Sequence, residues 1–179
     1  MKIVALSGST RVGSYNTALL SAMSKLSPVS MQVSLLDSLK SIPIFDPDLT
    51  EDLIPQIVNR YISKIREADG LLISCPEYAY GVTGVLKNFL DWLVATDSIV
   101  LKPVIVATVS TSGLGGVRSF CSLVNTLAAM NSNVVIEGSL CIPYAKNKFD
   151  ETLALVDDIT IQGVTVSLRA LARTITHGR

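Results

Sequence analysis

The chain has 179 residues, of which 49% are hydrophobic and 17% are charged, and this composition excludes a disordered protein. It supports one α/β domain over residues 1–179 with a large apolar core. The 15 basic and 15 acidic residues cancel, so no overall field attracts nucleic acid or an anionic membrane. No apolar run is long enough to span a bilayer and the N-terminus lacks signal-peptide features, so we expect a cytoplasmic protein.

The expected elements alternate between strand and helix along the whole chain. In chain order they are strand Lys2–Ser7, helix Asn16–Leu26, strand Met31–Leu36, a connecting loop Asp37–Leu49, helix Glu51–Asp69 with Pro55 in its first turn, strand Gly70–Cys75, helix Val82–Val94, strand Pro103–Val109, helix Val117–Asn131, strand Asn133–Ile142 bent at Gly138, and a mostly helical Phe149–Thr176 whose segment TIQGVTV admits a break. This order predicts a doubly wound α/β fold with five parallel strands, either Rossmann-like or flavodoxin-like. The flavodoxin-like sheet would have the strand order 2-1-3-4-5.

Three of the strands end in loops of small and hydroxylated residues. We call Gly8–Asn16 the first loop, Pro76–Thr83 the second loop and Ser110–Gly116 the third loop. Right-handed crossovers place all three loops at one edge of the sheet, where ligands bind in open α/β folds. Together the loops indicate a flat, phosphorylated cofactor.

The first loop has the composition of a phosphate site. It is not a Walker P-loop, because Ser14-Tyr15 stands where that motif requires Lys followed by Ser or Thr. Its hydroxyls, the Arg11 guanidinium and the free N–H groups of a helix N-terminus suit a phosphate monoester. The alternative is a serine-rich turn with helix caps, although capping needs one hydroxyl and this loop has several.

The second and third loops suit a planar ring. Tyr78 and Tyr80 alternate with Ala79 and Gly81, and such small residues let backbone amides approach a ligand. Glu77 has no partner for acid–base work nearby in sequence, so we assign it a structural role. The third loop is uncharged and glycine-rich and would cover the polar edge of the ring. The alternatives are an ordinary connection with two surface tyrosines and a flexible turn.

The cysteines and the histidine add no further site. Cys75, Cys121 and Cys141 match neither a disulfide framework nor a zinc pattern, so we expect buried thiols and no metal. His177 lies in a polar tail and is expected to be solvated. We therefore expect no catalytic side chain.

The segments GSTRVGSYN, PEYAYGVTGVLKNFLDWL and VSTSGLGGVR resemble the signature segments of the NADPH-dependent FMN reductase family. SLKSIPIFDPDL and IPYAKNKFDE extend the resemblance over nearly the whole chain. The resemblance implies a flavodoxin-like fold, bound FMN and NADPH or NADH as co-substrate. It places the FMN phosphate on Ser9, Arg11, Ser14, Asn16 and Thr17, the isoalloxazine on Pro76, Glu77, Tyr78, Ala79, Tyr80 and Gly81, and the pyrimidine side of the ring on Ser110, Ser112 and Gly113.

Two positions of the second loop depart from the family pattern. The family has Asn where this chain has Ala79, and Pro where it has Thr83. We expect the loss of the amide to weaken flavin binding or to change which acceptor fits.

The resemblance implies an FMN-dependent NAD(P)H oxidoreductase that passes hydride to flavin N5 and then, in a ping-pong cycle, to a small-molecule acceptor. The acceptor classes are quinones, azo compounds, metal oxyanions and flavins. Three alternatives stay open: a flavodoxin-type electron carrier, a nicotinamide-dependent dehydrogenase and a binding module without activity. A zero net charge counts against the carrier, since such proteins are usually strongly acidic.

The helix Val82–Val94 carries more apolar surface than one sheet face needs. Its residues Val85, Leu86, Phe89, Leu90, Trp92, Leu93 and Val94 cover an arc of roughly 200°, against about 100° for a surface helix. This excess predicts a homodimer or homotetramer built on that helix. The alternative is a cover provided by the loop before Lys102.

Overall fold

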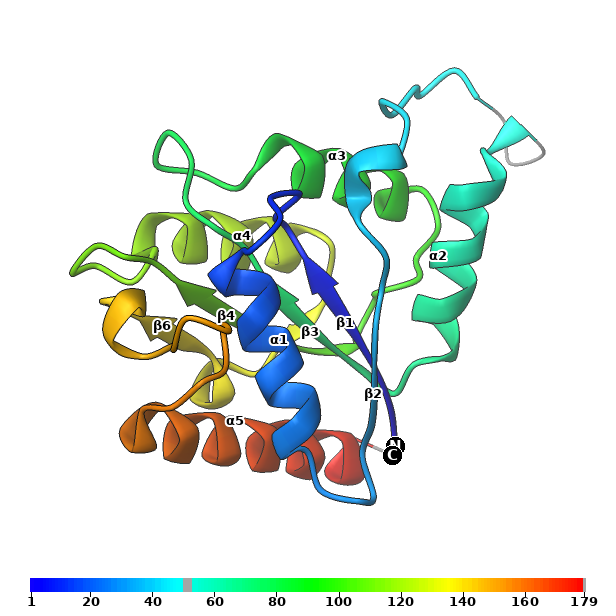
Figure 1. The fold of residues 1–179 in the computed structure, drawn as a ribbon. Helices are drawn as coiled ribbons and strands as arrows, with labels where there is room; N and C mark the ends of the chain where they lie inside the picture. The colour runs from blue at the N-terminus through cyan, green and yellow to red at the C-terminus, as the bar shows by residue number, and fades with distance from the viewer. Residues whose placement is uncertain (50–52, 179) are drawn as a thin grey trace.

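The computed structural model describes residues 1–49 and 53–178 (Figure 1). Its elements are β1 (Lys2–Ser7), α1 (Tyr15–Leu26), β2 (Gln32–Leu35), η1 (Leu39–Ser41), α2 (Gln56–Glu67), β3 (Gly70–Ser74), α3 (Gly84–Val94), β4 (Pro103–Val109), α4 (Val117–Ala129), β5 (Asn133–Val134), η3 (Ile136–Gly138), β6 (Leu140–Ile142), η4 (Ala145–Asn147) and α5 (Asp158–His177). The strand–helix alternation predicted from the sequence is confirmed.

The sheet is parallel and has the order β2-β1-β3-β4-β5, as predicted. The fifth strand predicted within Asn133–Ile142 is confirmed as β5, and the same segment holds a sixth strand, β6; both pair with β4. Between them the backbone turns through η3, and the Ser139 hydroxyl accepts the Val106 N–H at 3.2 Å. A side chain therefore replaces the missing backbone ladder at this point.

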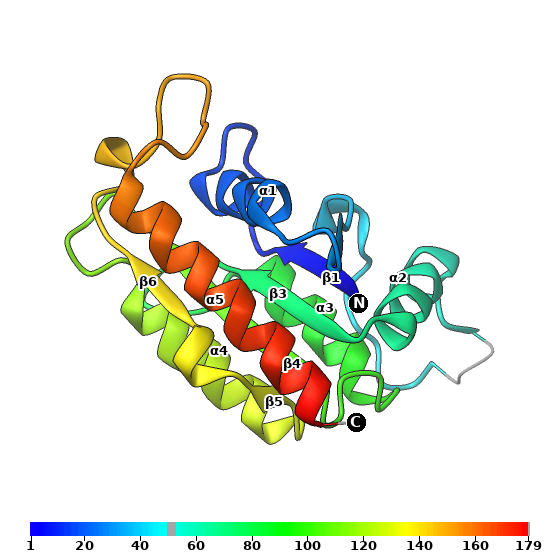
Figure 2. The same ribbon diagram turned by 90° about the horizontal axis from the view of Figure 1, so that it is seen from below.

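Helices cover both faces of the sheet, α1 and α5 on one face and α2, α3 and α4 on the other (Figures 1 and 2). Alternate residues of β4 point to opposite faces, with Val104 and Val106 in one apolar core and Ile105 and Ala107 in the other. All four are buried. The central strand is thus apolar on both faces, which explains its continuous β-branched sequence.

Two helix boundaries differ from the predictions. Helix α2 begins at Gln56 with Pro55 as its cap, and the predicted start at residues 51 and 52 lies outside the described residues. Phe149–Thr176 is mostly helical, as predicted, but the helix begins only at Asp158, and Phe149 forms an antiparallel bridge with Leu155. Helix α5 starts only where the Asp157 carboxylate accepts the Thr160 N–H at 2.9 Å.

Helix α5 then runs without a break through Gly163, where the sequence admitted one. Nothing lies within 4 Å of a Cβ placed at this glycine, so no close contact depends on its small size. The helix is held by the packing of residues such as Val164, Leu168 and Leu171 against the sheet. Tertiary burial thus outweighs the low helix propensity of the segment.

Much of the apolar arc of α3 is covered by the chain itself. The Trp92 indole N–H donates to the Pro43 carbonyl at 3.0 Å, and the Phe45 ring packs edge-on against Trp92 with centroids 5.2 Å apart. Asn88 bonds the same segment, accepting the Phe45 N–H at 2.8 Å and donating to Pro43. Residues 42–45 thus cover part of the arc, and Ile99 in the loop before Lys102 packs in the same core, whereas Val94 of the arc is 58% exposed. The interface predicted from this arc stays a prediction.

Cys75 is buried as expected, but Cys121 and Cys141 are exposed, so the prediction of three buried thiols is wrong. His177 is exposed as predicted. Among residues 1–49 and 53–178, no three His, Cys, Asp or Glu side chains gather as a metal site. Within the same residues, no helix combines the length and the apolar character needed to cross a membrane.

Candidate functional site

The first, second and third loops leave three strands that lie side by side. β1 pairs with β3, and β3 pairs with β4, all in parallel. Ser7 at the end of β1 is in register with Ser74 at the end of β3, and the Gly8 N–H donates to the Ser74 carbonyl at 2.7 Å. The prediction that the three loops share one edge of the sheet is confirmed.

Asn16 joins the ends of β3 and β4 to the start of α1. Its side-chain amide donates to the Val109 carbonyl at 3.0 Å, while its Oδ1 accepts from the Ser74 hydroxyl at 2.9 Å and from the Val109 N–H at 3.2 Å. The residue is only 3% exposed. Asn16 therefore fixes the spacing of the three loops. The sequence did not predict this structural role.

Thr83 ties the second loop to the first. Its hydroxyl is buried, with the residue 2% exposed, and donates to the Gly8 carbonyl at 2.7 Å. Gly8 also leaves little room, because a Cβ placed there would lie 3.0 Å from the Cys75 sulfur. The departure from proline at position 83 thus supplies a hydrogen bond between the two loops that proline cannot make.

The first loop is ordered by its own side chains. Ser14 caps α1 by accepting the Thr17 N–H at 3.4 Å, and the Ser7 and Thr17 hydroxyls bond each other at 2.7 Å. The Ser9 hydroxyl accepts the Arg11 N–H at 3.3 Å, which turns the chain toward the helix. Arg11 itself is exposed, four residues before the start of α1.

A hollow of about 460 Å³ borders this loop. Arg11, Ser14 and Thr17 line it on one side, and residues 152–154 face them. Ser9, Ser14 and Asn16 are buried, although Ser14 borders the hollow. The structure therefore brings three of the five predicted phosphate residues to the hollow, while the Asn16 side chain is engaged in the frame of the site.

The second loop contains a tight reverse turn. Tyr78 and Gly81 bond each other through both backbone groups, with N–H to carbonyl distances of 3.3 and 3.0 Å. Ala79 and Tyr80 between them have φ values of 48° and 62°, as in the two-residue turn that favours Asn and Gly. The family's Asn at position 79 suits this left-handed backbone, whereas Ala79 adopts it at a cost of about 1–2 kcal/mol.

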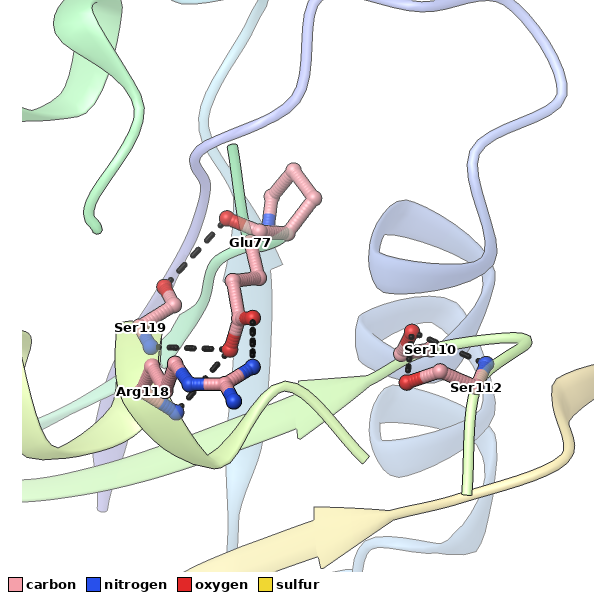
Figure 3. Close-up of polar contacts among 6 residues, drawn as sticks. Glu77, Ser110, Ser112, Arg118 and Ser119 are labelled. Carbon is pink, nitrogen blue, oxygen red and sulfur yellow. Dashed lines mark hydrogen bonds and ion pairs between the residues drawn. The ribbon is translucent and has the colours of Figure 1, made fainter. Parts of the chain in front are cut away.

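Glu77 is bound into the first turn of α4 (Figure 3). Its Oε2 accepts the N–H groups of Arg118 at 2.9 Å and Ser119 at 3.2 Å, and its Oε1 lies 3.5 Å from Arg118 Nη1. The Ser119 hydroxyl donates to the Pro76 carbonyl at 3.3 Å. A carboxylate at a helix N-terminus is electrostatically stabilised, which agrees with the structural role expected for Glu77.

Ser110 and Ser112 form a separate pair in the third loop, with their hydroxyls 3.1 Å apart (Figure 3). The loop is bonded to the chain after β6, since Tyr144 N–H donates to the Ser112 carbonyl and Ala145 N–H to that of Ser110. A Cβ at Gly113 would lie 2.8 Å from the Tyr144 hydroxyl. Tyr144 thus belongs to this edge of the sheet, although no sequence signal placed it there.

The groups gathered at this edge bind rather than react. They are hydroxyls, backbone amides and the Arg11 guanidinium, while the Glu77 carboxylate is occupied by α4. Although Cys141 is exposed, partial desolvation by its neighbours raises the pKa of its thiol, which disfavours the nucleophilic thiolate. Such a donor set fits a phosphate and a neutral planar ring, and thus fits FMN.

The comparisons with known proteins agree with this fit. The sequence profile of the family described as NADPH-dependent FMN reductase matches residues 1–147. A quinone reductase of Escherichia coli is 34% identical over 179 residues, covering 98% of this chain and 95% of that protein. An NAD(P)H-dependent FMN reductase of Pseudomonas aeruginosa is 34% identical over 173 residues, covering 96% and 93%.

Among solved structures, a flavoenzyme NAD(P)H:(acceptor) oxidoreductase from Paracoccus denitrificans superposes with a TM-score of 0.88 at 23% identity, covering 98% of this chain and 97% of that one. This likeness shows the flavodoxin-like fold. With the profile match over most of its length, the chain belongs to the NADPH-dependent FMN reductase family. It is an enzyme of that family, with FMN as its flavin and NADPH or NADH as co-substrate.

Proposed function

We propose that this protein oxidises NAD(P)H and reduces a small-molecule acceptor through FMN bound at the three loops. The observation that carries the proposal is the hydrogen-bonded frame of Asn16 and Thr83, which holds the ends of β1, β3 and β4 in one binding surface. The relatives named as quinone reductase and FMN reductase support an acceptor of the quinone or flavin type.

Each loop has its own part in the proposed site. The first loop holds the FMN phosphate through Arg11, Ser14, Thr17 and Ser9, with backbone N–H groups from the start of α1, including that of Asn16. Residues Pro76–Gly81 of the second loop line the isoalloxazine, and the Glu77 side chain holds this segment against α4. Ser110, Ser112 and Gly113 close the pyrimidine side.

Bound FMN supplies the hydride acceptor N5 and the two-electron chemistry. The protein's own task is to place the ring, to bind its phosphate and to leave one ring face open. The three loops are short, so nicotinamide and acceptor occupy that face in turn. This arrangement gives a ping-pong cycle and needs no protein acid or base for the hydride step.

The other candidate function is electron transfer between proteins in the manner of a flavodoxin. The balance of 15 basic and 15 acidic residues disfavours it, because the chain has no net negative charge that would favour docking to basic partners. We also propose a cytoplasmic location and no membrane or nucleic-acid partner, on the same balance of charge.

Steady-state kinetics of the purified protein reconstituted with FMN test the proposed function. We expect oxidation of NADPH or NADH in the presence of a quinone, an azo dye, chromate or free flavin, with parallel double-reciprocal plots at several acceptor concentrations. Intersecting lines would overturn the ping-pong cycle. If no such acceptor supports NAD(P)H oxidation while FMN still binds, the electron carrier is the better assignment.

The oligomeric state stays a proposal. Much of the apolar arc of α3 is covered within the chain, but Val94 of that arc is 58% exposed, and Val100 and Leu101 beyond the end of the helix are exposed too. We propose a homodimer or homotetramer that uses these side chains. Light scattering should give a mass at least twice 19.1 kDa, and Val94→Asp should lower it. A wild-type monomer at micromolar concentration would contradict the proposal.

A further inference from the structure

The turn Ala79–Tyr80 is not stabilised by its own sequence. Both residues lie in the left-handed region, where residues with a Cβ other than Asn and Asp are disfavoured. Tyr80 is also 71% exposed, so no apolar core holds its ring. Besides the two backbone hydrogen bonds between Tyr78 and Gly81, contacts from outside the second loop therefore help to maintain the shape of the surface on which the flavin ring is proposed to lie.

Those contacts come from the first turn of α4. The Arg118 guanidinium lies over the Tyr80 ring, with its Cζ 4.1 Å from the ring centroid. The same guanidinium is oriented by Glu77 Oε1 at 3.5 Å, and Glu77 Oε2 accepts the Arg118 and Ser119 N–H groups. The Glu77 side chain is only 17% exposed and that of Arg118 is 46% exposed. Glu77, Arg118 and Tyr80 thus form one connected cluster, which we call the α4 clamp.

We propose that Arg118 is a positioning residue for the proposed flavin site, which acts through Tyr80 to hold the left-handed turn of the second loop in its binding shape. The inference rests on the proposed function, since it assigns the second loop to the isoalloxazine. It adds a residue outside the three loops, and it explains how Ala79 is tolerated where the family has Asn.

Arg118 is proposed to change the fraction of molecules in which the turn has the binding shape. A turn that is disfavoured by its backbone spends part of its time in other shapes once its outside contacts are removed. The apparent affinity for FMN then falls by the fraction of molecules that keep the binding shape. A stacked guanidinium at an exposed site changes such an equilibrium by a factor of about two to five. Losing the Glu77 carboxylate removes charge-assisted bonds as well and has a larger effect, about tenfold.

The test is a fluorescence titration of the apoprotein with FMN, combined with visible circular dichroism of the bound flavin. Arg118→Ala should raise the FMN dissociation constant about threefold to fivefold and change the dichroism of the flavin bands. Arg118→Lys, which keeps the charge, should give an intermediate value. The matched control is Arg60→Ala on α2, which also removes an ion pair, to Asp37, and an arginine–tyrosine contact, to Tyr61. It should bind FMN as wild type does.

The second variant separates positioning from a general loss of structure. Ala79→Gly relieves the left-handed cost, so the turn keeps its shape without the clamp. In the Arg118→Ala background it should return the FMN dissociation constant to within about twofold of wild type, whereas in the wild type it should change little. Thermal unfolding of each apoprotein checks that the variants fold.

The outcomes separate this inference from the proposed function. If wild type binds no FMN, the proposed function fails. If wild type binds FMN and Arg118→Ala binds it equally well, the positioning role is wrong while the function stands. If Arg118→Ala weakens binding but Ala79→Gly does not restore it, Arg118 does not act through the turn and the inference is also overturned.

Discussion

The first and second loops, which we propose to form one site, are held in different ways. The first loop is ordered mainly by nearby side chains. These are the Ser14 cap, the Ser9 hydroxyl and the pair of Ser7 and Thr17, which flanks the loop. The second loop is ordered from outside, by α4 and by the Thr83 bond to Gly8. The hydroxyl groups that order a phosphate-binding loop can lie within one short stretch of sequence. A surface for a neutral ring instead depends on contacts with neighbouring elements for its shape.

The largest expected effect comes from the residue that joins the two arrangements. Asn16→Ala removes three buried hydrogen bonds and leaves the Ser74 hydroxyl and both Val109 backbone groups without their partner. We expect a loss of about 3 kcal/mol in the free energy of unfolding. Urea denaturation measures it, with exposed Asn125→Ala as the control. A loss below about 1 kcal/mol would show that water replaces these bonds and that Asn16 does not frame the site.

Arg11→Ala tests the first loop as a phosphate site. The guanidinium is the one charged group of this loop in the sequence, and a charge-assisted contact contributes about 1.5–3 kcal/mol, so FMN should bind about tenfold or more weakly. Riboflavin, which lacks the phosphate, should bind weakly to wild type and no more weakly to the variant. A fluorescence titration compares the two ligands. Unchanged FMN affinity would remove Arg11 from the phosphate site.

Thr83→Val tests the bond between the two loops. The change keeps the size of the side chain but leaves the Gly8 carbonyl without its buried donor. We expect a loss of about 1–2 kcal/mol in the free energy of unfolding and a severalfold weaker FMN affinity. Urea denaturation and FMN titration measure the two effects. Thr126→Val on α4, where the hydroxyl only bonds the Ser122 carbonyl, is a suitable control.

The smallest expected effect sharpens the contrast between the loops. Ala79→Asn places at the left-handed position a residue that tolerates it, so the free energy of unfolding should rise by about 0.5–1 kcal/mol. Chemical denaturation of the apoprotein measures the change. The same substitution at Ala129, at the end of α4, has no left-handed backbone to relieve and should not stabilise the protein. A destabilised Ala79→Asn would mean that the turn is not strained.

The alternation of strands and helices could be predicted from the sequence because buried β-branched runs and amphipathic periods are local signals. The ends of the individual helices and strands were harder to predict. Phe149–Asp157 has helical composition but forms a loop, because a bridge to Leu155 and the Asp157 cap delay the start of α5. The cover of Trp92 by Pro43 and Phe45 joins segments almost fifty residues apart, so a helical wheel alone assigned that arc to another subunit.

The sequence by itself determined three things: the order of the loops that follow the strands, the hydroxyl-rich composition of the first loop and the family to which the chain belongs. Each of these depends on residues that are consecutive in the chain. Only the tertiary structure decided that the buried Asn16 side chain bonds the Ser74 hydroxyl. The same holds for the bond between Thr83 and Gly8 and for the position of Arg118 over the Tyr80 ring. These contacts join residues 38 to 93 positions apart, and no local pattern encodes a hydrogen bond or a stacked pair that forms only when the sheet brings its strand ends together.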